Sequence, residues 1–280
     1  MIREEQQSLV RTTRREALLA MGAMGIASCC GCRSTPMTGR PQLRFIPKSM
    51  EMQLGEQSYA EVVSKSTPSQ NGAWTDAVRR TGERIAAVAN APGFQWEFRL
   101  LADKTQNAFC LPGGKVAIYE GIVPLCENEA GLAVVMSHEI AHALAHHGAE
   151  RMSQQAGVQG VGAVLGWAMS DTTPMTRDLA MRAFGTGAQY GLLLPYSRHH
   201  ESEADAIGLR LMAQAGYDPS EAPLFWGRFG NSKSGEQPAE WASTHPSDER
   251  RATDLANKLP EAMSLYQLTA NRYGRGERLV

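Results

Sequence analysis

The pattern His138-Glu139-Ile140-Ala141-His142 is the part of the sequence best suited to metal chemistry. If this segment is helical, its two histidines are four residues apart, project from one face and can bind a single ion. Glu139 lies beside that face, where its carboxylate can act as a base toward an attacking water. This HExxH pattern therefore predicts a metal-dependent hydrolytic site.

A hydrolytic zinc site needs three protein ligands and one open position, so a third ligand must come from another segment. In the acidic stretch 197–205, Glu201 and Asp205 are four residues apart on one helical face, and Glu203 is turned away from them. We assign Glu201 as the third ligand and Asp205 as the acceptor that fixes the tautomer of a ligand imidazole. Two rival ligands remain on spacing alone, His199 and His200.

The elements that must position these residues can be read from caps and periodicity. A helix is predicted from Glu127 or Asn128 through His147 to Gly148, and a second from Ser197 to about Gln214, closed by Gly216. Before them, the sequence predicts two helices over 49–91, broken at 66–72, and strands at 96–101 and 117–119 with a hairpin turn at 112–114. Residues 149–195 form either a packed helix pair or a surface that touches lipid. The predicted fold class is α+β, mainly helical, with a small sheet beside the HExxH helix.

The composition limits the remaining classes of function. The chain has 280 residues, 42% of them hydrophobic, which fits one large globular domain or two small ones. A formal net charge of −1 gives no basic surface for nucleic acid, and no apolar run reaches the roughly 18 residues of a membrane span. Cys110 and Cys126 either form a disulfide or remain free buried thiols.

The N-terminus has the composition of an export signal. Arg14-Arg15 precede the apolar stretch 17–28, as in twin-arginine signals, and Ile26-Ala27-Ser28-Cys29 resembles a lipobox whose cysteine is acylated. The alternative is an uncleaved cytosolic tail. We expect a signal peptide at 1–28, a tether at 29–48, a catalytic domain at 49–265 and a tail at 266–280. The expected location is the bacterial cell envelope, facing the periplasm, with a lipid on Cys29 as the membrane anchor.

Several segments together resemble the HtpX, Ste and Oma-type zinc endopeptidases of peptidase family M48, which are gluzincins. Besides the HExxH helix, the matching segments are Asn107-Ala108-Phe109 with Leu111-Pro112-Gly113-Gly114, Ser197-Arg198 with Glu201 and Ala204-Asp205, Thr244-His245-Pro246 with Arg251, and Thr38-Gly39-Arg40-Pro41-Gln42-Leu43. The last is similar to the opening of the peripheral, lipoprotein-like Oma branch. The membrane-embedded helices of the HtpX and Ste branches are missing, which also favours that branch.

The resemblance implies a zincin-like domain with one Zn²⁺ per chain, held by His138, His142 and Glu201, with Glu139 as the base. It also implies that an edge strand around Asn107, Ala108 and Phe109 receives an extended substrate. The expected function is hydrolysis of peptide bonds in unfolded or misassembled cell-envelope proteins, for protein quality control. The alternatives are a gated zinc-bearing chaperone or assembly factor with little proteolysis, and an adaptor with an accidental HExxH.

His245 is similar to the family histidine near the zinc. The resemblance leaves two roles open for it, as a donor to the developing oxyanion or as a removable fourth ligand that keeps the site closed. A third interpretation is a loop histidine that stacks on Trp241. His146 and His147 are interpreted as surface groups or as residues that contact a ligand without binding the ion.

Overall fold

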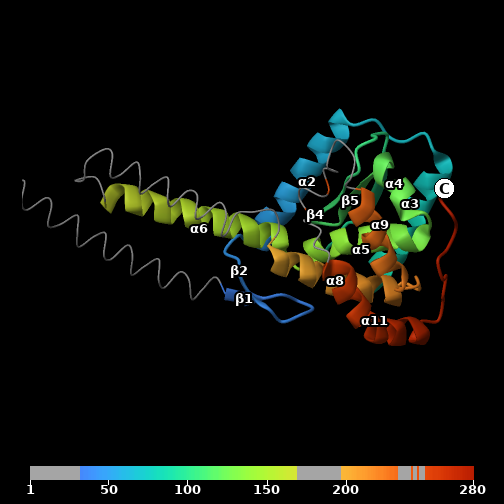
Figure 1. Cartoon of the computed structure of the whole chain (residues 1–280). Coiled ribbons are helices and arrows are strands. Elements are labelled where there is room, and N and C mark those ends of the chain that lie inside the picture. Colours follow the sequence, from blue (N-terminus) through green and yellow to red (C-terminus); the bar gives the residue numbers. More distant parts are fainter. Residues whose placement is uncertain (1–31, 169–196, 233–240, 242–244, 246–249) are drawn as a thin grey trace, which may run out of the picture.

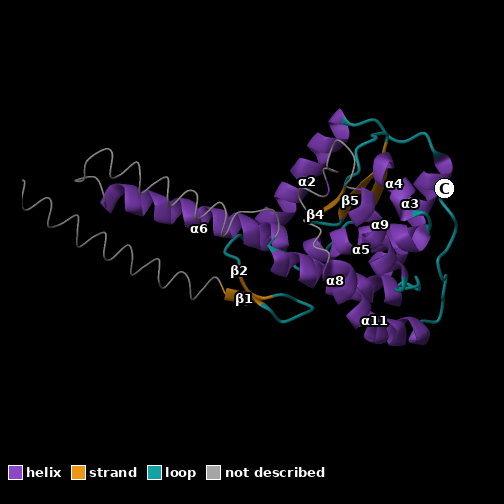
Figure 2. Cartoon of the chain, viewed as in Figure 1, coloured by secondary structure: helices purple, strands orange, loops and turns teal. Residues whose placement is uncertain are grey.

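The computed structural model of the chain describes residues 32–168, 197–232, 241, 245 and 250–280. Helices dominate this part of the chain and surround one small sheet, as Figure 2 shows. A separate two-stranded hairpin lies at the N-terminal end of the described residues. The predicted α+β, mainly helical fold is therefore confirmed.

The three-stranded sheet has the order β3-β5-β4, formed by β3 (Glu97–Leu101), β4 (Ala108–Leu111) and β5 (Lys115–Tyr119). β3 pairs with β5 in parallel and β4 pairs with β5 antiparallel, with Phe109 opposite Ala117. The predicted turn at 112–114 joins β4 to β5, and its two glycines have φ of +95° and +85°, which favours glycine. Because β5 is the central strand, β4 is one of the two edge strands of the sheet.

Two helices precede the sheet, as the sequence predicts. α2 (Lys48–Lys65) and α3 (Gly72–Val88) are separated by an extended segment that begins at Ser66. Asn71 caps α3, because its side chain accepts a hydrogen bond from the backbone N–H of Trp74 at 3.1 Å. α3 buries Ala77, Val78 and Ile85 in the main core, where it packs on β3 and on the helix described next.

The central helix is α5 (Glu129–Leu144), which carries the HExxH pattern, and all of its residues are buried. It follows the one-turn helix α4 (Val123–Cys126) and is capped by Asn128, which accepts from Gly131 N–H at 3.0 Å. The helix ends at Leu144, earlier than predicted. The reason is His146, whose φ of +56° interrupts the helix before α6 (His147–Ala168) begins. α6 then extends away from the other helices (Figure 1).

α8 (Arg198–Gln214) packs directly on α5 and carries the second acidic motif. Its predicted start and end are confirmed, with Ser197 as the N-cap and Gly216 at φ +88° just after it. A Cβ on Gly208 would lie only 3.1 Å from the backbone N of His138, so the glycine permits the close approach of the two helices. α9 (Glu221–Ser232) and α11 (Arg250–Leu268) pack against this pair.

The segment expected as a tether contains a hairpin instead. β1 (Cys32–Ser34) pairs antiparallel with β2 (Pro41–Leu43), and the side chains of Thr35 and Gln42 are buried. They are buried because they hydrogen-bond carboxylates on α8 and α6. The composition of this segment could not reveal the packed hairpin, since the hydrogen-bond partners of Thr35 and Gln42 lie more than a hundred residues away in the chain.

The C-terminal segment packs on the start of α5. The backbone N–H groups of Glu129 and Ala130 donate to the carbonyls of Glu277 and Arg275, each at 3.0 Å. Two of the N–H groups that a helix start leaves unpaired are thereby satisfied. The predicted domain boundary at 265 remains a prediction.

Several predictions fall on residues outside the described part. These are the export signal, the lipobox at Cys29, residues 169–196, Thr244 and Pro246. Within the described residues, none of the helices combines the length and the apolar character that crossing a bilayer requires. Cys110 and Cys126 are both free thiols.

Candidate metal centre

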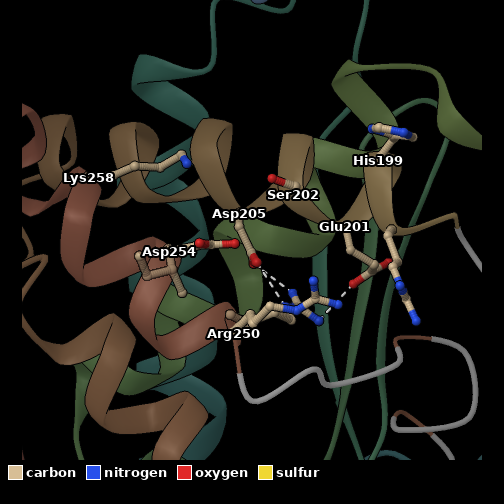
Figure 3. Close-up of a pocket in the computed structure, with 10 residues that line it drawn as sticks. His199, Glu201, Ser202, Asp205, Arg250, Asp254 and Lys258 are labelled. Atoms are coloured by element: carbon tan, nitrogen blue, oxygen red, sulfur yellow. Dashed lines mark hydrogen bonds and ion pairs between the residues drawn. The ribbon is translucent and has the colours of Figure 1, made fainter.

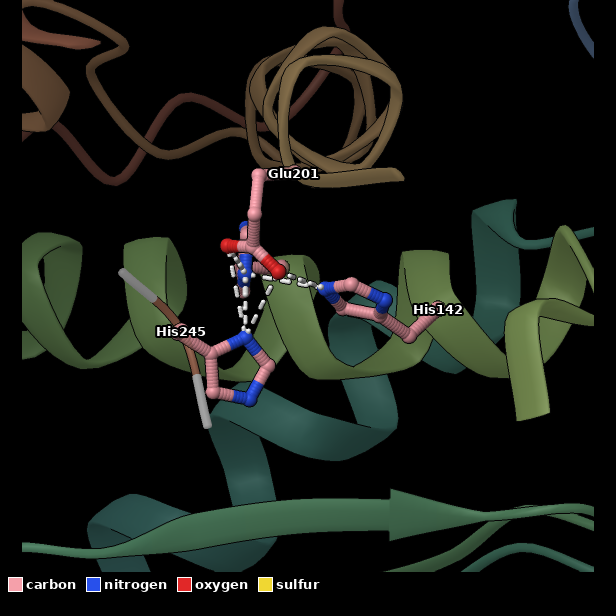
Figure 4. A group of neighbouring side chains, drawn as sticks. His142, Glu201 and His245 are labelled. Carbon is pink, nitrogen blue, oxygen red and sulfur yellow. Dashed lines mark hydrogen bonds and ion pairs between the residues drawn. The ribbon is translucent and has the colours of Figure 1, made fainter. Parts of the chain in front are cut away.

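Four buried side chains from three parts of the chain point their donor atoms at one another. They are His138 and His142 of α5, Glu201 of α8, and His245, and their donor atoms all lie within 4.8 Å of one another. The Nε2 atoms of His138 and His142 are 3.1 Å apart. Figure 4 shows Glu201 meeting the α5 rings from one side and His245 from another. The predicted convergence of the two helices is present.

His245 completes the group at short distances. Its Nδ1 lies 3.3 Å from His138 Nε2 and 3.1 Å from Glu201 Oε1. The His245 ring is also tilted against Trp241, with ring centroids 5.3 Å apart. The contact with Trp241 that we weighed as an alternative therefore exists together with membership of the donor group.

Glu139 lies beside this group and contacts residues from the same distant segment. Trp241 Nε1 donates a hydrogen bond to Glu139 Oε1 at 2.6 Å, and His245 Nε2 lies 3.4 Å from the same oxygen. The carboxylate is thus outside the four-donor group but adjacent to it. The role of Trp241 was missed, because a tryptophan 102 residues away in the chain carries no sequence signal for this contact.

Asp205 and Arg251 fix the far side of the site. Asp205 Oδ1 lies 3.1 Å from His138 Nδ1, as predicted for the acceptor of a ligand imidazole. Arg251 donates to both Asp205 oxygens, at 2.8 and 2.6 Å, and its Nη1 lies 2.8 Å from Glu201 Oε2. The guanidinium also lies 3.5 Å over the ring of Trp226. These contacts orient both carboxylates.

The electrostatics of the group favour a positive charge among the rings. Burial acts to lower the pKa of His138, but hydrogen bonds with Asp205 and Glu201 raise it to about 9. Burial acts to raise the pKa of Glu201, and hydrogen bonds from the three histidines outweigh it and hold this pKa well below its ordinary range. For His142, burial dominates and lowers the pKa well below its ordinary value. The two carboxylates therefore favour a positive charge beside imidazoles that burial alone would keep neutral.

The donor set also fits a metal ion on geometry. Four tetrahedral donors with bonds of ~2.0 Å lie about 3.3 Å from one another. Five contacts among these residues, which involve both Glu201 oxygens, are 3.1 to 3.4 Å, and the four donor atoms all lie within 4.8 Å of one another. With the Nδ1–H of His138 directed at Asp205, the lone pair of its Nε2 faces inward. The lone pair of His138 Nε2 and the oxygens of Glu201 can therefore bind the same cation.

The other predicted residues occupy different places. His199 and His200 are not in the donor group, and His200 Nε2 lies 3.1 Å from Glu150 on α6. His147 is fully buried, and its Nδ1 lies 2.9 Å from Nδ1 of His142. His146 instead contacts Glu51 on α2, at 3.0 Å. Ala108 and Phe109 lie on the edge strand β4, directly after Asn107.

A cavity of about 200 Å³ lies between α8 and α11, behind the two carboxylates (Figure 3). Its lining residues all come from these two helices and include Glu201, Asp205, Arg250 and Lys258. Charged residues of both signs line the cavity. Among them, Arg251 of α11 contacts Glu201 and Asp205 of α8.

Comparison with known proteins identifies the family. The model of peptidase family M48 matches residues 73–259. The mitochondrial metalloendopeptidase OMA1 of Schizosaccharomyces pombe is 37% identical over 251 residues, which cover 88% of this chain and 71% of that protein. OMA1 of Arabidopsis thaliana is 33% identical, over 81% of this chain and 46% of that protein. The beta-barrel assembly-enhancing protease of Escherichia coli is 28% identical, over 92% of this chain and 53% of that protein.

These relatives contradict the predicted location in a bacterial cell envelope. The OMA1 proteins of two yeasts and a plant are mitochondrial, and the bacterial proteases are less similar to this chain than the fission-yeast protein is. The prediction rested on an N-terminal pattern that the structure does not describe. The family match, the similarity to OMA1 and the buried donor group agree with one another, and the chain belongs to peptidase family M48 as a metalloendopeptidase.

Proposed function

We propose that this chain is a zinc-dependent endopeptidase in which His138, His142 and Glu201 hold one Zn²⁺ and Glu139 is the general base. The observation that supports it best is the set of donor separations of 3.1 to 3.4 Å among buried histidines and a carboxylate. Nitrogen and oxygen ligands in a three-residue set are typical of hydrolytic zinc sites. When bound, zinc would supply Lewis-acid polarisation of the scissile carbonyl and of the attacking water.

The chain's own residues perform the proton transfers and the orientation. Glu139 takes a proton from the attacking water and returns it to the leaving amine. Trp241 holds the Glu139 carboxylate through its indole N–H, at 2.6 Å. Asp205 accepts from the Nδ1–H of His138, which leaves Nε2 free as a donor atom.

We propose that His245 acts as the removable fourth ligand. The position of its Nδ1, within 3.3 Å of both His138 Nε2 and Glu201 Oε1, supports this role over that of an oxyanion donor. With His245 in place, four side chains would surround a bound ion, so this histidine would have to move before substrate enters. This favours a gated enzyme, and a chaperone-like protein with little proteolysis is the second outcome of the test below.

The substrate is an extended chain that adds to the sheet along β4. β4 is the edge of its sheet and follows Asn107 directly. Backbone hydrogen bonds at an edge strand recognise any extended peptide, so this mode gives broad sequence tolerance. We therefore propose unfolded or misassembled proteins as the substrate class, with protein quality control as the role.

We propose separately that Cys29 carries a lipid anchor. This anchor would not specify the cellular compartment. It rests on the lipobox-like sequence Ile26-Ala27-Ser28-Cys29 alone. Mass spectrometry of the purified full chain checks it, because acylation adds the mass of fatty acyl groups at that cysteine. A free or internal Cys29 peptide would exclude the anchor and leave the peptidase assignment unaffected.

The test of the proposed function combines metal content with cleavage of a denatured protein. Wild type should hold one zinc per chain and degrade casein, and a chelator should abolish cleavage. Glu139→Gln should retain zinc and fold but lose cleavage. Glu201→Ala should bind zinc much more weakly, because the carboxylate ligand is removed and His245, the removable ligand, is left as the third donor. A full zinc content in Glu201→Ala would show that another residue is the third ligand. Zinc binding without cleavage in wild type would favour the chaperone.

A further inference from the structure

A second buried polar cluster connects the N-terminal hairpin to the metal group. The cluster is formed by one arginine, two glutamates and two histidines from the hairpin, α6 and α8, namely Arg40, Glu150, Glu203, His147 and His200. All except Arg40 are at most 7% exposed. The function proposed above uses none of them.

The contact between His142 and His147 fixes the protons on both rings. Their Nδ1 atoms are 2.9 Å apart, so one must donate and the other accept. If His142 binds a metal through Nε2, which faces His138, then its Nδ1 must carry the proton. His147 therefore accepts at Nδ1 and must carry its own proton on Nε2.

Glu203 is placed to select that tautomer. Its Oε2 lies 2.9 Å from His147 Nε2 and, as a carboxylate, can only accept a hydrogen bond. A hydrogen on His147 Nε2 is therefore favoured, and His147 Nδ1 is left as an acceptor for His142. The sequence of donors and acceptors is consistent from Glu203 to the metal-facing nitrogen of His142.

The hairpin holds Glu203 in this position. Arg40 Nε donates to Glu203 Oε2 at 2.6 Å, and Thr35 Oγ1 donates to Oε1 at 3.0 Å, with Thr38 also bonded to Oε1. The same guanidinium donates to both oxygens of Glu150 on α6, at 3.0 and 2.6 Å. Arg40 is thus anchored on α6 while it orients a carboxylate on α8.

We propose that Arg40 is a positioning residue of the metal site, which acts through Glu203 and His147 to fix the tautomer and orientation of His142. This inference rests on the proposed metal-binding role of His142. It makes the N-terminal hairpin part of the metal site, although Arg40 itself does not reach the donor group. A residue that hydrogen-bonds a metal ligand directly, as His147 does here, typically contributes about 10- to 100-fold to metal affinity.

The test measures zinc affinity by competition with a chromophoric chelator, on the full chain. Arg40→Gln should weaken zinc binding by up to about tenfold, at the low end of the range for direct partners, because it acts on His142 through two intervening side chains. The matched control is Arg33→Gln on the same hairpin, whose arginine is exposed and outside the cluster, and it should leave the affinity unchanged. The absorption spectrum of the Co²⁺-substituted protein should also change in Arg40→Gln and not in the control, because the geometry at His142 changes.

A double-mutant cycle separates positioning from general destabilisation. Once Glu203→Gln or His147→Ala has cut the connection, Arg40→Gln should cause little further loss of affinity. Multiplicative losses, or an Arg40→Gln protein with wild-type zinc affinity and Co²⁺ spectrum, would overturn the inference. Should one variant fail to fold, the other completes the cycle. Absence of zinc from wild type would instead refute the proposed function, so the two failures are distinguishable.

Discussion

Trp241 Nε1 and Glu139 Oε1 are 2.6 Å apart, so an indole N–H holds the carboxylate next to the metal group. The Trp241 backbone also connects the edge-strand region to His245, because its N–H donates to Gln106 O at 3.2 Å and its C=O accepts from His245 N–H at 2.8 Å. Trp241 thereby contacts Glu139, the residue two positions before β4, and His245.

Replacing this tryptophan tests the orientation of the base. Trp241→Phe keeps most of the buried ring but removes the donor to Glu139. We expect kcat to fall about 10- to 100-fold, because a small misplacement of a catalytic group has an effect of that size, while zinc content stays unchanged. The control is Trp74→Phe, which removes an indole hydrogen bond to Leu279 O between two residues outside the donor group. Equal kcat for both variants would contradict the orienting role.

The free edge of β4 can be blocked at one backbone position. Tyr119 N–H donates to Asn107 O, and the alternation of antiparallel pairing then directs the N–H of Cys110 away from β5. Cys110→Pro should therefore spare the ladder but reduce kcat/KM for an extended peptide about tenfold, the value of one hydrogen bond. Cys110→Ala removes only the thiol and should retain activity. If both variants behave alike, the substrate does not pair at this position.

The close approach of α8 to α5 depends on Gly208. A valine there would force the helices apart, since a Cβ would lie 3.1 Å from the backbone of His138. We expect Gly208→Val to lower the free energy of unfolding by about 1 to 3 kcal/mol and to weaken zinc binding, because Glu201 moves away from the histidines. Gly227→Ala, where a Cβ meets open space, is the control. Thermal unfolding and zinc titration of both variants measure this, and unchanged zinc affinity in Gly208→Val would count against the packing argument.

Acid stability should depend on Glu150. Burial acts to raise its pKa, but hydrogen bonds with His200 and Arg40 lower it from 4.5 to about 2. The folded chain thus binds fewer protons at this group than the unfolded chain, so the stabilisation is complete above about pH 4.5 and is lost as the pH falls toward 2.

The comparison is with Glu150→Gln, which cannot ionise. At neutral pH the variant should be less stable by about 3 kcal/mol, since a buried charge network loses a partner. The difference from wild type should shrink between pH 5 and pH 2. Urea unfolding of both proteins across this range measures it, and a difference that stays constant would show that the carboxylate is not the group responsible.

The elements that carry the donor group could be predicted because their signals are local. Asn128 and Ser197 mark helix starts, and the spacing of His138 to His142 and of Glu201 to Asp205 places each pair on one face. The end of α5 could not be predicted in the same way. Its interruption depends on a left-handed backbone at His146, a conformation that is uncommon for residues other than glycine, and the nearest glycine, Gly148, lies two residues past it.

The supporting contacts escaped prediction because they are made at long range. Periodicity indicates correctly that Glu203 is turned away from the Glu201 face, but not that Arg40, 163 residues earlier, meets it there. The same holds for Trp241 and Glu139, 102 residues apart. Sequence patterns identify which residues have the chemistry, whereas tertiary packing decides which of them touch.

Segments from the two ends of the described chain hold opposite ends of α5. Glu277 and Arg275 accept from the first N–H groups of the helix, and Gln42 Nε2 donates to the carbonyl of Ala145 just past its last residue, at 2.9 Å. Removal of either segment would thus perturb the helix that carries His138 and His142. Recombinant versions should keep residues 32–43 and 273–279 intact, and hydrogen exchange at Ala130 and Ala145 would report whether they do.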